Sequence, residues 1–224
     1  MKKYGVIRTL IQDKISEILP DYETYKEIDN IWHTKKIDDD TIIKIWISVI
    51  DRKVEIELSL FFVVLNIRTE IIYSVFTKNE YFEKKSFTSG VNFNNELHRF
   101  YVKTDAQIDL WIYKAQIEIR KNIEGLEKYQ DIQELEKLFN YDFKNKPIEA
   151  LDINHKQILK GLIMSKLVNE EDYLFLFEKA LKIYEYGGFV DSLISECKEL
   201  NIFLTKHSKQ KLSDINYLRK LINQ

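Results

Sequence analysis

Glu55 and Glu57 are the strongest candidates for chemistry in this sequence. Apolar residues alternate around them, which predicts a strand, and side chains two residues apart in a strand lie on one face. Two carboxylates on one face could carry out acid–base chemistry or hold a divalent ion, and His33, on another predicted strand, could join them in a hydrolase site. Exposed carboxylates on a water-facing sheet surface produce the same pattern and are the more ordinary explanation.

The remaining histidines and the single cysteine offer little for a metal or a nucleophile. His98, His155 and His207 lie in separate segments, and none has the spacing of a metal-binding pair with another histidine. Cys197 falls on an apolar helical face, where a buried thiol behaves as a small apolar group. We therefore expect no metal site and no disulfide, and the single cysteine favours a reducing, cytoplasmic location.

Trp46 is the unusual tryptophan of this sequence because its predicted neighbours on the sheet face are polar. These neighbours are Lys44, Ser48, Glu55, Glu57 and Ser59. An indole on a polar sheet surface fits an interface anchor, since tryptophan is enriched at binding hot spots. The alternative is that a helix predicted at residues 3–19 packs over this face and buries the ring.

Negative charge is concentrated in the first quarter of the chain. Residues 13–57 contain twelve Asp or Glu against seven Lys or Arg, including the run Asp38, Asp39 and Asp40. This excess predicts an acidic patch that suits a partner with a basic surface. The whole chain has a formal charge of −2, which gives no electrostatic reason to expect nucleic acid or an anionic membrane.

Composition excludes several other classes of protein. A hydrophobic fraction of 45% in 224 residues indicates a folded core and argues against general disorder. No segment approaches the ~20 apolar residues of a membrane span. Gly187 and Gly188 are not followed by the Lys-Ser or Lys-Thr of a phosphate-binding loop, so we expect no nucleotide cofactor.

A central hairpin at residues 41–64 organises the predicted fold. Apolar residues occupy odd positions up to Val49 and even positions from Val54, so the chain turns through an even number of loop residues. A loop at Asp51 and Arg52 pairs residues whose numbers sum to 103, including Val49 with Val54. A four-residue loop with the same register is the preferred prediction, because Asp-Arg is a poor pair for a type I′ turn.

Helices and weaker strands surround this hairpin. Residues 3–19 predict an amphipathic helix that ends at Pro20. Asn66 can cap a short helix, and Thr104 with Gln107 forms the clearest capping box of the chain. The other predicted elements are strands at 22–28, 30–36, 90–94 and 97–103, a loop at 78–90 and a helix that starts at Asp131.

The last third of the chain has a purely helical pattern. We predict helices near 153–167, 170–186, 189–200 and 212–223, with the best boundary at 141–147. The predicted fold class is therefore α+β: an antiparallel meander sheet packed by helices in residues 1–146, followed by an all-helical region in residues 147–224.

The first 145 residues resemble a family of uncharacterised bacterial α+β domains that are often found near polymorphic-toxin immunity genes. The resemblance rests on IWHTKKIDDDTIIKIWISVI, on DLWIYKAQIEIRKNIEGL and on QELEKLF. It implies a protein that binds another protein, and it supplies no catalytic residues.

We expect a non-enzymatic, protein-binding protein, in its most specific form an immunity protein that neutralises a toxin. The expected binding residues are Trp46, Glu55, Glu57, Asp38, Asp39 and Asp40. Two alternatives stay open. One is a hydrolase that uses Glu55, Glu57 and His33, and the other is an adaptor that binds through its C-terminal helices.

Overall fold

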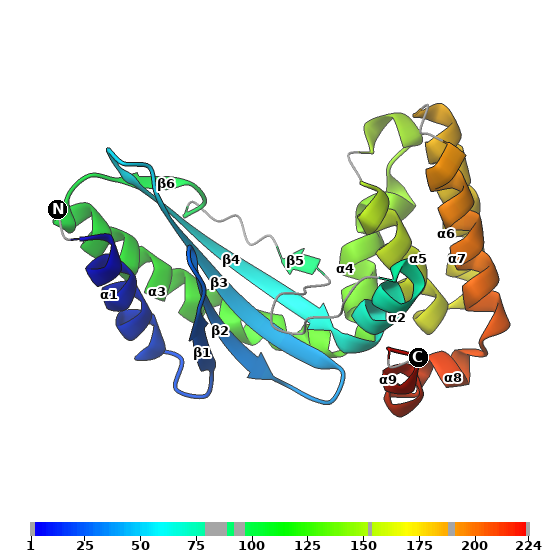
Figure 1. The fold of residues 1–224 in the computed structure, drawn as a ribbon, viewed down its shortest axis with the longest axis horizontal. Coiled ribbons are helices and arrows are strands. Elements are labelled where there is room, and N and C mark those ends of the chain that lie inside the picture. The colour runs from blue at the N-terminus through cyan, green and yellow to red at the C-terminus, as the bar shows by residue number, and fades with distance from the viewer. Residues whose placement is uncertain (1–2, 79–88, 92–96, 152–153, 188–190, 223–224) are drawn as a thin grey trace. The chain divides into compact units, whose positions relative to one another are not determined.

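The protein has an α+β fold, as the sequence predicts, in which an antiparallel sheet with helices is combined with an all-helical region (Figure 1). A computed structural model describes residues 3–78, 89–91, 97–151, 154–187 and 191–222. The chain divides into two compact units. We call residues 1–65 with 89–130 the sheet unit, and residues 66–88 with 131–224 the helical unit.

The sheet unit is built on an antiparallel meander. Strands β1, β2, β3 and β4 are neighbours in chain order, and both β5 and β6 pair with β4. The strands are β1 (Glu23–Lys26), β2 (Asn30–Lys36), β3 (Thr41–Asp51), β4 (Ile56–Asn66), β5 (Ser89–Val91) and β6 (Phe100–Val102). Residues 79–88 of the predicted loop and residues 92–94 of the predicted strand at 90–94 lie outside the described residues, whereas the last two residues of the predicted loop belong to β5.

The turn between β3 and β4 lies two residues further along than predicted. The Arg52 N–H donates to the Glu55 carbonyl over 2.9 Å, so Lys53 and Val54 form the centre of the turn. Lys53 has φ 72°, as a tight hairpin turn requires, and its N–H donates to the Asp51 carboxylate. The predicted pairing of Val49 with Val54 is therefore wrong, and Val54 is 78% exposed. Alternation of apolar residues cannot detect a shift of this kind, because moving the turn by two residues keeps every side chain on its face.

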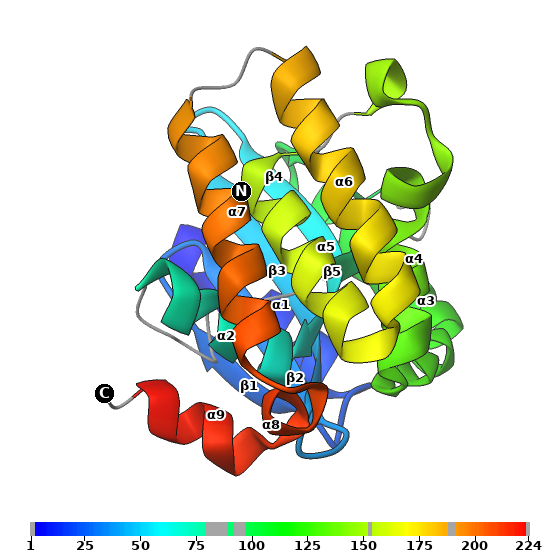
Figure 2. The same cartoon turned by 90° about the vertical axis from the view of Figure 1, so that its right-hand side faces the viewer.

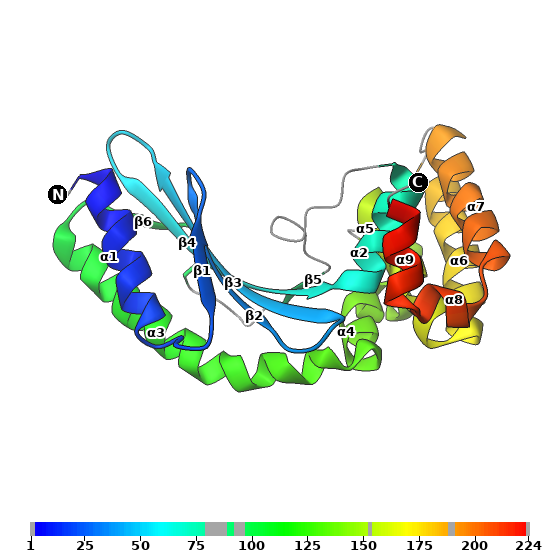
Figure 3. The same cartoon turned by 60° about the horizontal axis from the view of Figure 1, so that its bottom comes forward.

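One face of the sheet, which we call the core face, is covered by two helices. These are α1 (Tyr4–Ser16) and α3 (Asp105–Glu127), seen on the same side of the sheet in Figure 3. Four apolar side chains of β3 point to the core face and are fully buried: Ile43, Ile45, Ile47 and Val49. Burying each such side chain contributes ~1.5–3 kcal/mol. The helices supply matching fully buried residues: Ile7, Ile11, Ile15, Ile108, Trp111, Ala115 and Ile119.

Helix α3 starts where the capping box predicts. The Thr104 hydroxyl accepts from the Gln107 N–H, while the Gln107 side chain accepts from the Thr104 N–H. This pair satisfies backbone donors that the first turn of a helix leaves free. Helix α3 continues to Glu127 and is followed by a 3-10 turn, η1 (Lys128–Gln130).

The helical unit is centred on α5 (His155–Val168), which packs against four other long or medium helices (Figure 2). Every residue of α5 from Ile158 to Leu167 is buried. The surrounding elements are α2 (Ile67–Thr77), α4 (Ile132–Asn145), η2 (Ile148–Ala150), α6 (Glu170–Tyr186), α7 (Asp191–Lys206), α8 (Lys209–Ser213) and α9 (Ile215–Ile222).

The units divide differently from the expected boundary at residues 146–147. Helices α2 and α4 belong to the helical unit, since both pack on α5. Gly161 allows the close approach of α4, because a Cβ at this position would collide with Asn140 Oδ1. The sequence pattern marks where helices begin and end, but it does not reveal which neighbour each helix packs against.

Candidate binding surface on the sheet

Four aromatic rings form a continuous stack across the sheet face opposite the core face. Tyr25, Trp32, Trp46 and Phe61 come from β1, β2, β3 and β4 respectively, and we call them the aromatic ladder. Their successive ring centroids are 6.0, 5.1 and 4.4 Å apart, with interplanar angles of 13°, 15° and 24°. The stack follows from the strand register, which places Tyr25 opposite Trp32 and Trp32 opposite Trp46. We call this surface the ladder face.

The two central indoles use both of their ring faces within the stack. Trp32 lies between Tyr25 and Trp46, while Trp46 lies between Trp32 and Phe61. A base or a sugar that binds by stacking needs a free ring face. The ladder offers a partner mainly ring edges, which suits apolar side-chain contacts from another protein better than flat stacking of a ligand.

Polar contacts fix the centre of the ladder. Trp46 Nε1 donates to Asn30 Oδ1 over 2.7 Å, and the buried Lys44 places its Nζ 5.9 Å from the Trp32 ring. Beyond Phe61, the His98 ring meets the ladder edge-on at 5.2 Å. These contacts hold the rings in a defined orientation, as a preorganised binding surface requires.

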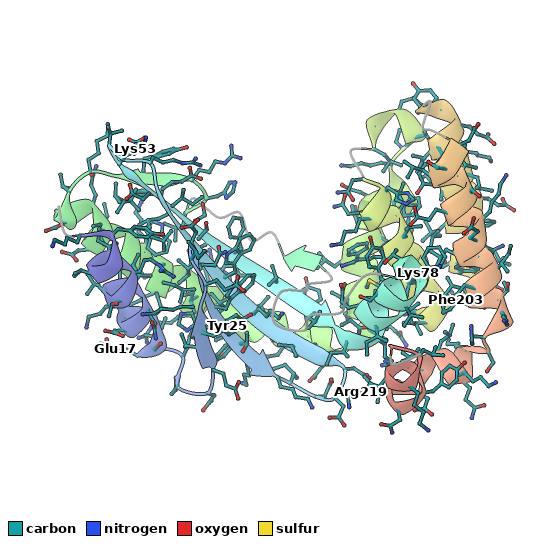
Figure 4. All side chains as sticks on the ribbon, viewed as in Figure 1. Glu17, Tyr25, Lys53, Lys78, Phe203 and Arg219 are labelled. Atoms are coloured by element: carbon teal, nitrogen blue, oxygen red, sulfur yellow. The ribbon has the colours of Figure 1, made fainter. Side chains whose placement is uncertain are left out.

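The ladder is only partly open to solvent. Trp32 is 5% exposed, whereas Tyr25, Trp46 and Phe61 have intermediate exposure. Burial raises the pKa of the Tyr25 hydroxyl above its ordinary value, with Glu27 as a second cause, so Tyr25 keeps its proton at neutral pH. Figure 4 shows Tyr25 on the sheet and Lys53 at the tip of the β3–β4 hairpin.

Trp46 is neither opposite Glu57 nor covered by the N-terminal helix. Its direct neighbour is Phe61, because the hairpin register differs from the predicted one. Helix α1 packs on the core face instead, where the Ser16 and Thr24 hydroxyls lie 3.3 Å apart and Thr24 contacts His33. The alternative in which the N-terminal helix buries Trp46 is therefore wrong, while its role as an interface anchor stays a prediction for a ring that lies between two other rings.

Both residues of the predicted acidic pair are engaged in ion pairs, Glu57 on β4 and Glu55 in the turn just before it. Glu57 is 6% exposed and accepts from Arg52 Nη2 over 2.8 Å and from Arg52 Nε over 3.1 Å. The Glu55 carboxylate lies 3.4 Å from Lys103 Nζ. Both glutamates therefore brace the end of the hairpin.

Asp38, Asp39 and Asp40 form the turn between β2 and β3. The Asp38 carboxylate accepts from the N–H groups of Asp40 and Thr41 over 2.8 and 2.7 Å, which closes the turn. Asp39 pairs with Lys36 over 2.8 Å, but its side chain remains 87% exposed. Asp39 therefore lies in the exposed turn that joins the two strands carrying Trp32 and Trp46.

His33 lies on the core face, away from Glu57. It is fully buried, and its Nδ1 is 2.9 Å from the Thr24 hydroxyl. Burial lowers the pKa of His33 to about 4, so the ring is neutral at physiological pH. The structure does not bring His33, Glu55 and Glu57 together, although a hydrolase site would need them to converge.

The helical unit contains a polar cluster that the sequence analysis missed. Glu70 and Lys160 form a buried ion pair of 2.5 Å, with side chains 4% and 3% exposed. Nearby on α5, His155 bridges the Tyr184 hydroxyl at 2.5 Å and Glu196 at 2.9 Å. The polar residues of α5 follow no regular spacing, so the sequence carries no clear signal for this cluster.

Cys197 is fully buried in α7, as the sequence predicts. Burial raises the pKa of its thiol to about 12, with a smaller contribution from Glu196, so the group stays protonated. It packs as part of the core.

Comparison with family models, with curated proteins and with solved structures finds no match to this chain. Among the described residues, none of the helices combines the length and apolar character of a membrane span. In the same part of the chain, no three His, Cys, Asp or Glu side chains gather as metal ligands would. Among the described residues, the ladder face is the most distinctive surface from which a function can be proposed.

Proposed function

We propose that this protein acts by binding another protein through the ladder face, without performing catalysis. The aromatic ladder is the observation that carries this proposal: four rings from four successive strands form one preorganised stack. Tyrosine and tryptophan dominate protein-binding hot spots, because they supply a large contact area with few rotatable bonds. The most specific form of the proposal, in line with the family resemblance, is an immunity protein whose partner is a toxin domain.

The partner is expected to carry a basic surface. The sheet unit holds the acidic excess of residues 13–57, and the Asp39 side chain is 87% exposed. Several other acidic groups of this region are already paired within the chain, including Glu17, Glu55 and Glu57. Electrostatic attraction should therefore speed association and aid selectivity, while the ladder supplies most of the affinity.

Charge reversal at Asp39 tests the electrostatic part of this proposal. Tagged wild type and Asp39→Lys would be used to capture partners from the native host at low and at high salt. A basic partner should be captured by the wild type and lost from the variant, most clearly at low salt. Asp39 lies in an exposed turn, so the variant should unfold at nearly the wild-type temperature.

Asp142→Lys is the matched control. Asp142 is also an exposed aspartate in an ion pair, with Lys146 at 2.8 Å, but it belongs to α4 of the helical unit. This control should capture the partner as well as the wild type does. A partner that is lost equally from both variants, or retained by Asp39→Lys, would contradict an acidic contribution from the sheet unit.

A further inference from the structure

Strand β1 forms one edge of the sheet. Within the part of the chain that the structure describes, β1 pairs with β2 alone, in the register that sets Tyr25 opposite Trp32. An edge strand presents, on its outer side, backbone N–H and C=O groups that can pair with another strand. The outer side of β1 is therefore a surface that fits an extended backbone.

The hydrogen bonds between β1 and β2 determine which groups of β1 point outward. The Glu27 N–H donates to the Asn30 carbonyl over 2.9 Å. In an antiparallel pair the hydrogen-bonded positions recur at every second residue, so Tyr25 also bonds to β2. The N–H and C=O groups of Thr24 and Lys26 therefore point away from β2, toward the outer side of the sheet.

The bonds between β2 and β3 give the same assignment. The Val49 N–H donates to the Asp29 carbonyl over 2.8 Å, so the odd-numbered residues of β2 bond to β3. Even-numbered residues such as Trp32 then bond to β1, in agreement with the pattern on β1 itself. Helix α1 approaches β1 from the core face, where the Ser16 and Thr24 hydroxyls lie 3.3 Å apart. This contact uses the side chain of Thr24 and not its outward backbone groups.

We propose that the partner adds an antiparallel strand to β1 and so lengthens the aromatic ladder. This inference rests on the proposed function and specifies how the partner is held. Thr24 and Lys26 each bond to the added strand through both N–H and C=O. The residue between these two pairs lies directly opposite Tyr25, with the two Cα atoms ~4.5 Å apart. A large apolar or aromatic side chain at this position continues the ladder.

The charge beside Tyr25 defines a second position of the added strand. Glu23 is exposed and lies two residues before Tyr25, so both side chains are on the ladder face. A lysine or arginine opposite Glu23 forms a favourable cross-strand pair. The segment that fits is therefore an extended one in which a basic residue follows a large apolar residue by two positions. Such a segment agrees with the basic surface expected of the partner.

A second copy of the chain fits this edge less well. In one register, Thr24 bonds to Lys26 of the second copy. That register sets Glu23 opposite Glu27, and like charges directly opposite each other destabilise a sheet. A register centred on Lys26 sets two lysines opposite each other, and one centred on Thr24 needs Tyr22, whose N–H already donates within the chain. A foreign strand avoids these conflicts.

A synthetic strand tests the edge without the native partner. The probe is the peptide Thr-Lys-Thr-Phe-Thr-Lys-Thr, whose phenylalanine is designed to lie opposite Tyr25 with a lysine opposite Glu23. Titration into the isotope-labelled full chain should shift the amide resonances of Thr24 and Lys26 most, with a dissociation constant of ~1 mM or lower. N-methylation of the two threonines beside the phenylalanine removes the donors that face β1. The N-methylated probe should bind ~10-fold or more weakly.

Lys26→Pro removes an outward N–H from β1, and Lys26→Ala is the matched control for the loss of the side chain. Proline is tolerated on an edge strand where the lost N–H faces outward, so Lys26→Pro should melt close to the wild type. It should bind the probe ~10-fold or more weakly. Lys26→Ala should bind within ~3-fold of the wild type, because Lys26 is exposed. If Lys26→Pro does not fold, the N-methylated probe makes the same comparison on the wild type.

Several results would contradict the added strand. These are no saturable shifts with the probe at about 5 mM, equal binding of the plain and N-methylated probes, or equal binding by Lys26→Ala and Lys26→Pro. Association of the chain with itself that Lys26→Pro removes would overturn the choice of a foreign strand.

Failure of the proposed function gives a different result. The probe then still binds β1, while Asp39→Lys captures the same proteins as the wild type. Conversely, a captured basic partner that binds Lys26→Pro as tightly as the wild type would leave the proposed function in place and overturn the added strand.

Discussion

The ring of Trp46 lies 4.4 Å from the ring of Phe61 on the neighbouring strand, at an angle of 24°. Trp32 stacks on the other side of Trp46, and Asn30 accepts a hydrogen bond from the indole nitrogen. Trp46 thus contributes both to the stability of the sheet and to the surface that the sheet presents.

Trp46→Ala should reduce stability and binding together. Removing the ring empties a site between two other rings and leaves Asn30 without its indole donor, so the free energy of unfolding should fall by about 2–4 kcal/mol. Chemical denaturation followed by tyrosine and tryptophan fluorescence measures this change. Tyr141→Ala is the control, because Tyr141 is 65% exposed and its loss should change stability by less than about 0.5 kcal/mol. Equal stability of Trp46→Ala and the wild type would contradict the stacked arrangement.

His33 should make the protein sensitive to mild acid. Its pKa is about 4 in the folded chain against 6.5 for an ordinary histidine, so the unfolded chain binds more protons between these values. The associated stability is fully present above pH 6.5 and is lost progressively as the pH falls toward 4, by up to about 3 kcal/mol.

His33→Gln removes this titration while keeping a side chain that can bond to Thr24. The wild type should therefore lose more stability than the variant as the pH falls from 7 to 4. If the variant has the lower urea midpoint at pH 7, the two midpoints should converge over this range. Carboxylates titrate in both proteins, so the difference between the two pH profiles isolates the imidazole. Parallel profiles would show that His33 is not held neutral by burial.

Removing one partner of the Glu70–Lys160 pair should lower the free energy of unfolding strongly, whereas replacing both partners together should lower it little. Both side chains are almost fully buried, so Lys160→Met leaves the Glu70 carboxylate inside the helical unit without its ion-pair partner. We expect a loss of about 3–5 kcal/mol. The double variant Glu70→Leu with Lys160→Met should recover most of it, since neither charge then needs compensation. Additive losses in the double variant, measured by denaturant unfolding, would contradict a direct coupling between these two residues.

The sequence predicts where the helices and strands of this fold lie better than it predicts which of them pack or pair with one another. The capping residues Asn66 and Thr104 act within a few residues of themselves, so local pattern is enough to locate the helix starts they mark. The hairpin turn depends on which two residues adopt the turn conformation, and alternation alone left that position two residues in error.

The sequence predicts only part of the candidate surface, because the contacts between its residues depend on strand register. The sequence marks Trp46 through its polar neighbours, but the stack with Trp32 and Phe61 depends on the register between strands. Aromatic residues at same-face positions of four successive strands were the available signal. Predicting the state of the two glutamates would require knowing their partners in the fold. These are Lys103 for Glu55 and Arg52 for Glu57.

The most direct test of the ladder face uses a photoreactive residue at its edge. Tyr25→p-benzoylphenylalanine would be incorporated in cells of the native host and irradiated, with Tyr141→p-benzoylphenylalanine on α4 as the matched exposed position. We predict that a basic protein forms a covalent adduct at position 25 and forms none at position 141. The same protein, once purified, should bind Asp39→Lys at least ~10-fold more weakly than it binds the wild type. An adduct that forms equally at both positions, or only at position 141, would contradict binding through the ladder face.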